Sequence, residues 1–165
     1  MAKRKSKQQL APKEPEAQLG YQFNSMRIIE YRGDNIEGVS GAGIKLAFNV
    51  RTEFGISEEP PMVIVSPEVT CALLDQPDRE VCFLKMQMIF RVQGLESYDI
   101  KSEMKLPEAF MGNIVNLSVG AMRGVLFAKN QGMSYANVII PPLDVQELLP
   151  KGPFRPTDEV MEISA

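Results

Sequence analysis

Apolar and polar residues alternate most clearly between residues 44 and 54. The even positions of this segment are mostly apolar: Ile44, Leu46, Phe48, Val50 and Phe54. Polar residues fill most of the positions between them: Lys45, Asn49, Arg51 and Glu53. A period of two predicts a β-strand with one dry face and one wet face. A sheet built from such strands is antiparallel and covered on one side only.

Three other segments predict strands, at residues 21–31, 62–74 and 81–93. In the last of them the even positions from 84 onward are apolar: Leu84, Met86, Met88, Phe90 and Val92. Pro67 lies inside the middle segment and cannot donate a hydrogen bond to a neighbouring strand, which predicts an edge position or a bulge there. Residues 75–78 (DQPD) suit a tight turn before the last strand, because proline presets φ.

The period changes to that of a helix between residues 108 and 129. Apolar residues recur here at helical spacing: Ile114, Leu117, Ala121 and Val125. Further apolar residues widen the stripe beyond one face: Val115, Val119, Met122 and Leu126. Such a helix needs cover on two sides, which we expect from the sheet and from another subunit. Gly120-x-x-x-Gly124 resembles a membrane dimer motif, but Asn116 and Arg123 interrupt the segment, so we interpret it as soluble helix packing.

Residues 137–149 (NVIIPPLDVQELL) predict an extended linker followed by a short helix. Pro141 and Pro142 cannot lie inside a helix, and Asp144 can cap the turn that follows. Four apolar residues give this helix one dry edge: Leu143, Val145, Leu148 and Leu149. Periodicity alone leaves open a terminal helix that packs on its own core. The predicted fold class is α+β: a four-stranded antiparallel sheet with one long and one short C-terminal helix.

Length and composition limit the function. The 165 residues fit one domain with a sizeable core, and no apolar run reaches 18 residues, which argues against a membrane span. The chain has no histidine, which excludes histidine-based acid–base catalysis and histidine metal sites. It also lacks a glycine-rich nucleotide-binding motif. We therefore expect no enzymatic activity, no cofactor and no metal.

Sulfur-containing residues leave two interpretations open. Cys71 and Cys82 lie eleven positions apart without a Cys-x-x-Cys motif, so we expect buried free thiols. The ten methionines are either core residues or the flexible lining of a groove that accepts many sequences. The candidates for such a lining are Met86, Met88, Met122 and Met133.

The two ends of the chain differ from its middle. Residues 1–20 carry five positive and two negative charges and have no periodicity, which predicts a disordered basic tail. Residues 150–165 predict a flexible C-terminal tail, and residues 21–149 the folded domain. The rest of the chain after residue 20 is acidic, which argues against nucleic acid as a partner. The basic start lacks the apolar stretch of a signal peptide, so we expect a cytoplasmic protein.

Several short motifs resemble those of the SecB family of export chaperones. After Pro142, apolar residues stand at the family's spacing: Leu143, Val145, Leu148 and Leu149. Residues 89–96 (IFRVQGLE) resemble the family's apolar-aromatic-x-apolar-x-Gly-apolar-Glu segment, and the helix start at residues 112–114 (GNI) also has a counterpart. The family usually has aromatic residues where this chain has Val145 and Leu149. The resemblance covers about residues 21–149.

The resemblance implies an ATP-independent holdase that keeps unfolded proteins or preproteins from aggregating. It also implies a role in protein export and a homotetramer built as a dimer of dimers. The implied client-binding groove comprises Phe48, Phe54, Met86, Phe90, Tyr135, Leu143, Val145, Leu148 and Leu149. The family docks the translocase ATPase SecA through acidic residues. Residues 82–85 of this chain lack the corresponding Glu, so Asp34 and Glu37 are the candidates for a translocase-facing site.

A second interpretation comes from a different functional class. A protein with the same fold could serve one dedicated partner, as toxin–antitoxin-associated chaperones, antitoxins or immunity-type proteins do, without general chaperoning, because fold does not fix function. One high-affinity partner, with no effect on unrelated unfolded proteins, would distinguish this interpretation from a general holdase.

Overall fold

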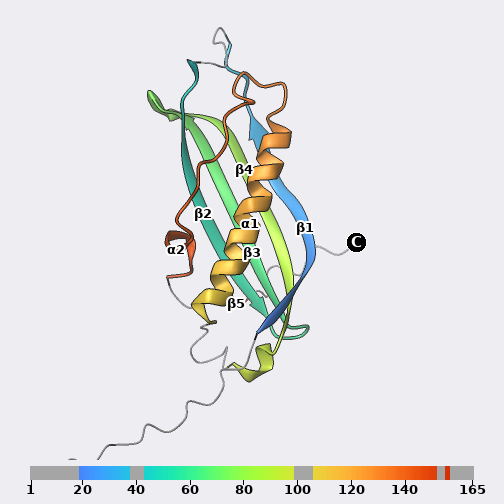
Figure 1. Ribbon diagram of the computed structural model, residues 1–165. Helices are drawn as coiled ribbons and strands as arrows, with labels where there is room; N and C mark the ends of the chain where they lie inside the picture. The colour runs from blue at the N-terminus through green and yellow to red at the C-terminus, as the bar shows by residue number, and fades with distance from the viewer. Residues whose placement is uncertain (1–18, 38–42, 99–105, 152–154, 157–165) are drawn as a thin grey trace, which may run out of the picture.

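The computed structural model describes residues 19–37, 43–98, 106–151 and 155–156, and it confirms the predicted α+β fold (Figure 1). Four long strands form an antiparallel sheet in the order β1-β4-β3-β2. Their bounds are β1 Gly20–Gly33, β2 Leu46–Ser57, β3 Met62–Leu73 and β4 Gln76–Gln93. A two-residue strand, β5 (Arg155–Pro156), pairs in parallel with the outer edge of β2. The predicted tail of residues 1–20 lies almost entirely outside the described residues.

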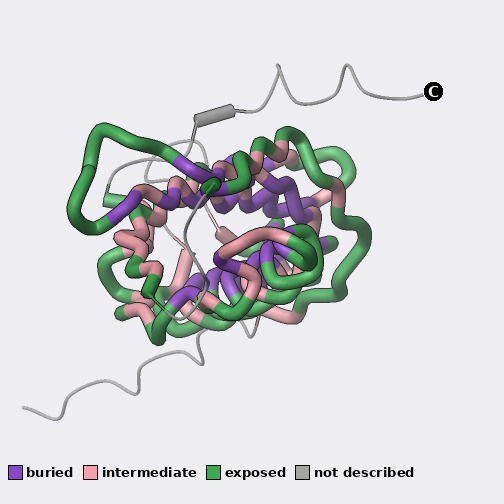
Figure 2. Tube along the Cα trace, turned by 90° about the horizontal axis from the view of Figure 1, so that it is seen from above, coloured by how far each residue is buried: buried purple, intermediate pink, exposed green. Residues whose placement is uncertain are grey.

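Two helices cover one face of the sheet. The long helix α1 (Glu108–Lys129) crosses β3 and β4 diagonally (Figure 1). The short helix α2 (Val145–Leu148) contacts both α1 and β2. A 3-10 turn, η2 (Leu95–Ser97), follows β4. Viewed along the layers, the buried residues lie mainly between α1 and the sheet (Figure 2). The molecule is therefore a two-layer structure with one core.

The predicted alternation decides which residues enter that core. On β3 the odd positions are fully buried beneath the helix: Val63, Val65, Val69 and Cys71. On β4 the predicted even positions face the same layer: Leu84, Met86, Met88, Phe90 and Val92. Because successive side chains of a strand point to opposite faces, the opposite side of each strand faces away from α1.

Two predictions about turns and edges are wrong. The β3–β4 turn comprises Leu74–Asp75 rather than residues 75–78, because Leu73 pairs directly with Gln76. Pro77 instead lies in β4, beyond Cys82, the last β4 residue that pairs with β1, so its missing N–H costs no bond to β1. Pro67 lies in the interior strand β3, where the pairing with β4 skips Ser66 and Pro67 without a register shift.

Helix α1 begins after Pro107 and ends before Asn130, as the period predicted. Gly132 follows with φ of 89°, the left-handed conformation that commonly ends a helix. By length and composition α1 could cross a membrane, but a core helix of a soluble protein passes the same test. Eight of its residues are buried in the molecule, among them Ile114, Val115 and Met122. This burial is that of a core helix.

Candidate functional site

Six of the nine predicted groove residues lie along one flank of α1. Phe48 and Phe54 come from the helix side of β2, and the other four come from the linker and α2: Leu143, Val145, Leu148 and Leu149. All six are half-buried. Phe48 and Leu143 pack against one part of the core, whereas Phe54 and Leu149 pack against the other. We call these six residues the linker band.

Polar contacts hold the linker and α2 in this position. Arg123 on α1 donates from Nη2 to the carbonyl oxygen of Pro141, and the Thr52 hydroxyl on β2 donates to the carbonyl oxygen of Leu148. The Asp144 side chain caps α2, because its Oδ1 accepts from the backbone N of Gln146 at 2.9 Å. The linker is therefore attached at both ends, to the helix and to the sheet.

The other three predicted groove residues lie in the core. Met86, Phe90 and Tyr135 are each 0% exposed. The Tyr135 hydroxyl donates to the carbonyl oxygen of Val81 at 2.9 Å, and burial raises the pKa of this phenol. Met88 and Met122 are buried as well, whereas Met133 is half-buried and packs against the cluster that contains Met86 and Met122. Met86, Phe90 and Tyr135 therefore offer no surface to a partner in this structure, and three of the four candidate methionines are core residues: Met86, Met88 and Met122.

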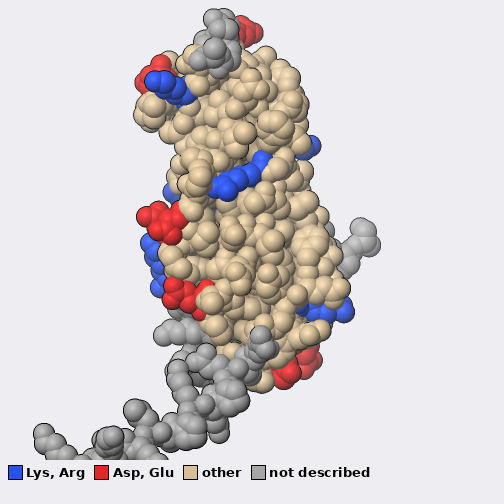
Figure 3. All heavy atoms as spheres, viewed as in Figure 1, with Lys and Arg blue, Asp and Glu red and all other residues tan. Residues whose placement is uncertain are grey.

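The opposite flank of α1 exposes a larger apolar surface that sequence reasoning did not find. Four side chains on the helix side of β1 are 38–51% exposed: Tyr21, Phe23, Met26 and Ile28. Tyr21 and Phe23 approach Phe90 edge-on, with ring centroids 6.0 and 5.9 Å apart. We call these four residues the β1 face. Figure 3 shows that charged side chains are sparse on the helix side of the molecule and gather mainly near its margins.

Helix α1 adds two exposed apolar side chains on its outer surface. Leu117 is 49% exposed and Phe127 is 44% exposed. Gly120 and Gly124 lie between them on the same stripe, and a side-chain carbon added at either glycine would meet nothing within 4 Å apart from the adjoining part of the helix itself. The outer surface of α1 is therefore apolar and, at the two glycines, free of side chains. Such a surface allows another protein surface to pack closely on it.

The two candidate acidic residues lie near one end of the sheet. Asp34 and Glu37 are exposed on the segment after β1. Asn35 and Ile36 attach this segment to the loop after α1, because the Asn35 side chain accepts from Ser134 N at 2.9 Å and Ile36 N donates to Ser134 Oγ at 3.1 Å. Neither acidic residue belongs to the face of the sheet that α1 leaves open, and SecA docking stays a prediction.

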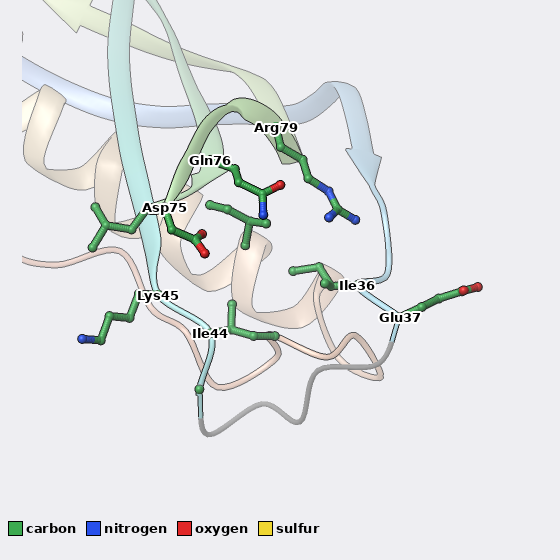
Figure 4. A pocket seen from close by; sticks show the side chains of 10 residues that line it. Ile36, Glu37, Ile44, Lys45, Asp75, Gln76 and Arg79 are labelled. Carbon is green, nitrogen blue, oxygen red and sulfur yellow. The ribbon is translucent and has the colours of Figure 1, made fainter.

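The same end of the sheet contains a pocket of about 590 Å³ (Figure 4). Ile36, Ile44 and Leu73 form its apolar lining, and charged side chains of both signs stand around it. The Glu37 side chain points away from the pocket (Figure 4). Among the residues that the structure describes, no group of three or more Cys, Asp and Glu is placed to hold a metal ion.

The prediction of buried free thiols is confirmed. Cys71 and Cys82 are opposite each other on β3 and β4, and both are buried and free. The Cys82 thiol donates to Asn130 Oδ1 at 3.5 Å, and the Tyr31 hydroxyl donates to the same oxygen at 3.1 Å. Hydrogen bonding from Cys71 lowers the pKa of Cys82, whereas the same bond and burial raise the pKa of Cys71. The pair connects the sheet to the end of α1.

No family model and no curated protein matches this sequence. Among solved structures, the chain is similar to the Mycobacterium tuberculosis SecB-like chaperone Rv1957 in complex with a ChAD peptide from the Rv1956 HigA1 antitoxin. The TM-score is 0.50 at 12% identity, over 75% of this chain and 90% of that chain. The fold is SecB-like. The chain is also similar, with a TM-score of 0.43 and 12% identity over 78% of this chain and 99% of the other, to a protein of unknown function from Streptococcus agalactiae.

Proposed function

We propose that this protein is an ATP-independent chaperone that binds extended, apolar segments of other polypeptides without covalent chemistry. The observation that carries the proposal is the apolar surface on the helix side of a SecB-like fold, where large side chains are left exposed or half-buried on both flanks of α1. A folded monomer rarely leaves such patches without a partner. Burial of apolar area stabilises a complex by about 25 cal/mol per Å².

The linker band is the client-binding site in this proposal. Its six side chains are half-buried, so they are held in place by the core and still present apolar area. The hydrogen bonds from Arg123 and Thr52 fix the linker and so reduce the conformational entropy that binding would otherwise cost. A band of this kind recognises apolar side chains rather than one sequence.

The β1 face and the outer stripe of α1 pair with a second copy of the chain in this proposal. Both surfaces are more exposed than the linker band, and the glycines of α1 let another helix approach closely. Several linker bands in one homo-oligomer, such as the expected dimer of dimers, would bind one long client with avidity. A cytoplasmic location and a role in export through SecA are further parts of the proposal.

The test is light scattering from an aggregation-prone protein diluted out of denaturant, with and without this protein and without ATP. We expect suppression at near-stoichiometric oligomer. The double variant Val145→Asp with Leu149→Asp should lose this suppression, because a client bound to the band would bury two unpaired charges, which is costly. The matched control is Leu74→Asp, since Leu74 is 58% exposed and lies at the β3–β4 turn outside the band. If the band variant suppresses scattering as well as the Leu74→Asp control does, the client-binding site lies outside the linker band.

A dedicated partner is the second candidate function. The solved chaperone of similar fold carries an antitoxin peptide, and a single short segment of one partner could occupy the linker band in the same way. If the wild-type protein is folded and suppresses no scattering, a pull-down for one tight partner follows. Binding of that partner that the band variant abolishes would establish the dedicated role.

A further inference from the structure

The face of the sheet that points away from α1 contains buried side chains with no described element over them. Gly55, Ile64 and Ile89 pair side by side on β2, β3 and β4, so they form one row across the sheet. Ile64 is only 3% exposed, although α1 and α2 lie on the opposite face (Figure 1). The two packed clusters of the core do not include Ile64. Its neighbour on this face, Met62, is 9% exposed.

Two polar groups on the same face are buried without partners. Arg27 on β1 pairs with Gln87 on β4 in the strand register, two residues along each strand from the row and on the same face. Gln87 is 7% exposed, and neither its Oε1 nor Arg27 Nε has a hydrogen-bond partner among the described residues. Unsatisfied buried groups each cost about 1–3 kcal/mol, so such groups usually meet a ligand, water or another segment. Gln87 Oε1 can accept, and Arg27 Nε can donate, a hydrogen bond to a segment that covers this face.

The strand β5 brings the chain to the start of this row. Arg155 pairs with Gly55 and Pro156 with Ile56, both in parallel at the outer edge of β2. Gly55 has no side chain, so a chain can pass over the sheet edge at this point. Crossing from β2 to β1 takes three strand spacings, about 14 Å, whereas nine extended residues span about 30 Å. Residues 157–165 are thus long enough to cross the whole row.

The composition of residues 157–165 (TDEVMEISA) complements the face. It has three acidic residues and three large apolar ones, Val160, Met161 and Ile163. On the sheet, Lys85 is already paired with Glu53 at 2.9 Å and Glu68 at 3.5 Å. Arg27 and Arg91 make no ion pair with any described residue, and they flank the row of Ile64 and Ile89 on its two sides. Apolar residues between free arginines fit a segment that mixes apolar and acidic residues.

We propose that the open face of the sheet is a docking surface for residues 157–165 of the same chain. The segment's apolar side chains would cover Ile64 and Met62, and its carboxylates would pair with Arg27 and Arg91. This docking surface lies on the other side of the sheet from the linker band.

Methionine oxidation tests this proposal with internal controls, because peroxide oxidises methionine according to its exposure. Met62 is the only methionine between Arg51 and Arg79, so one tryptic peptide reports it. A chain that stops after Pro156 should oxidise Met62 at least about five times faster than the full chain. Met26, which is 45% exposed on β1, should be unchanged. The peptide of residues 86–91, with buried Met86 and Met88, should stay protected in both.

A full-length variant keeps the test decisive if the shortened chain loses its fold. Asp158→Lys, Glu159→Lys and Glu162→Lys reverse the charge of the segment at constant length, and the same rise at Met62 is expected. A labelled peptide of residues 157–165 should also bind the shortened chain at least about tenfold more tightly than the full chain, because the face is free only in the former. A scrambled peptide of the same composition is the control.

Three results would overturn the proposal. An equal Met62 rate in all three proteins at every concentration means that residues 157–165 do not cover the face. A Met62 rate that rises only on dilution means that a second copy of the chain covers it. Rapid oxidation of Met62 in the full chain means that the face is free for an outside partner from the start.

Discussion

The two flanks of helix α1 differ in what covers them. On the β2 flank, the chain supplies its own cover, because the linker and α2 lie against Phe48 and Phe54 and are fixed by Arg123 and Thr52. On the β1 flank, no described helix lies over the β1 face, whose four side chains stay 38–51% exposed. In the proposed function, the half-buried linker band binds clients and the more exposed β1 face binds a second copy of the chain. The two flanks of one helix therefore differ in how much apolar surface they leave exposed.

The largest expected effect is on the free energy of unfolding, and it distinguishes the buried Phe90 from the exposed Phe23 in one aromatic cluster. Phe90→Ala should lower the free energy of unfolding by about 3–5 kcal/mol, because Phe90 is fully buried and its removal leaves a cavity. Phe23→Ala removes a ring in edge contact with Phe90 but 51% exposed, and should cost about 1 kcal/mol in the monomer. Urea denaturation at low protein concentration measures both. Equal losses would show that Phe90 is not a core residue.

The next effect concerns assembly. Met26→Asp with Ile28→Asp places two charges on the β1 face and should weaken self-association at least about tenfold, because a buried unpaired charge is costly. The band variant of the proposed function should leave assembly unchanged. Light scattering coupled to gel filtration gives the molar mass of each. If the band variant dissociates the oligomer and the β1 variant does not, the roles of the two flanks are reversed.

Alkaline pH tests whether Tyr135 belongs to the core. Burial raises its pKa above the ordinary value of 10.0, so its neutral form stabilises the fold. This stabilisation is complete below pH 10 and is lost as the pH rises towards the folded pKa. Urea denaturation at pH 8 and at pH 10.5 should show a smaller loss for Tyr135→Phe than for wild type. A wild-type phenol at position 135 that titrates freely near pH 10 would place it in an open groove.

The smallest effect is on the attachment of the linker. Arg123→Ala removes the bond to the Pro141 carbonyl and should cost about 0.5–1.5 kcal/mol locally. Hydrogen exchange of residues 143–149 should accelerate, whereas exchange in β3 should not change. Lys129→Ala, on the same helix, is the control. A uniform acceleration throughout the sheet would mean that the linker is part of the global fold rather than an adjustable cover.

Regular periodicity made most of the fold predictable. The alternation in β2 and β4 and the helical period of α1 gave their positions to within a few residues, because burial on one side dictates every second or every third to fourth side chain. The β3–β4 turn was misplaced because Asp75-Gln-Pro-Asp78 has turn chemistry, whereas the register of Leu73 with Gln76 decided its position. Pairing partners, which set that register, do not appear in local sequence.

The candidate site was less predictable. The pattern of β4 correctly showed that Met86 and Phe90 are on a dry face, but not that α1 covers this face completely. The β1 face was missed because register shifts between Phe23 and Ser25 and between Ile28 and Glu30 change the phase of the strand. Its apolar residues therefore share one face without alternating strictly in sequence. Which part of the sheet stays exposed depends on the direction in which α1 crosses it, and sequence periodicity does not predict that direction.

The two irregularities of β1 have a consequence for solubility. A strand of 14 residues at the edge of a sheet, with large apolar side chains, is a template on which further strands could add without limit. Each bulge twists the strand and interrupts its row of backbone donors and acceptors. The bulges therefore oppose the edge-to-edge addition of further strands at β1, so this long apolar strand is a poor template for an endless sheet.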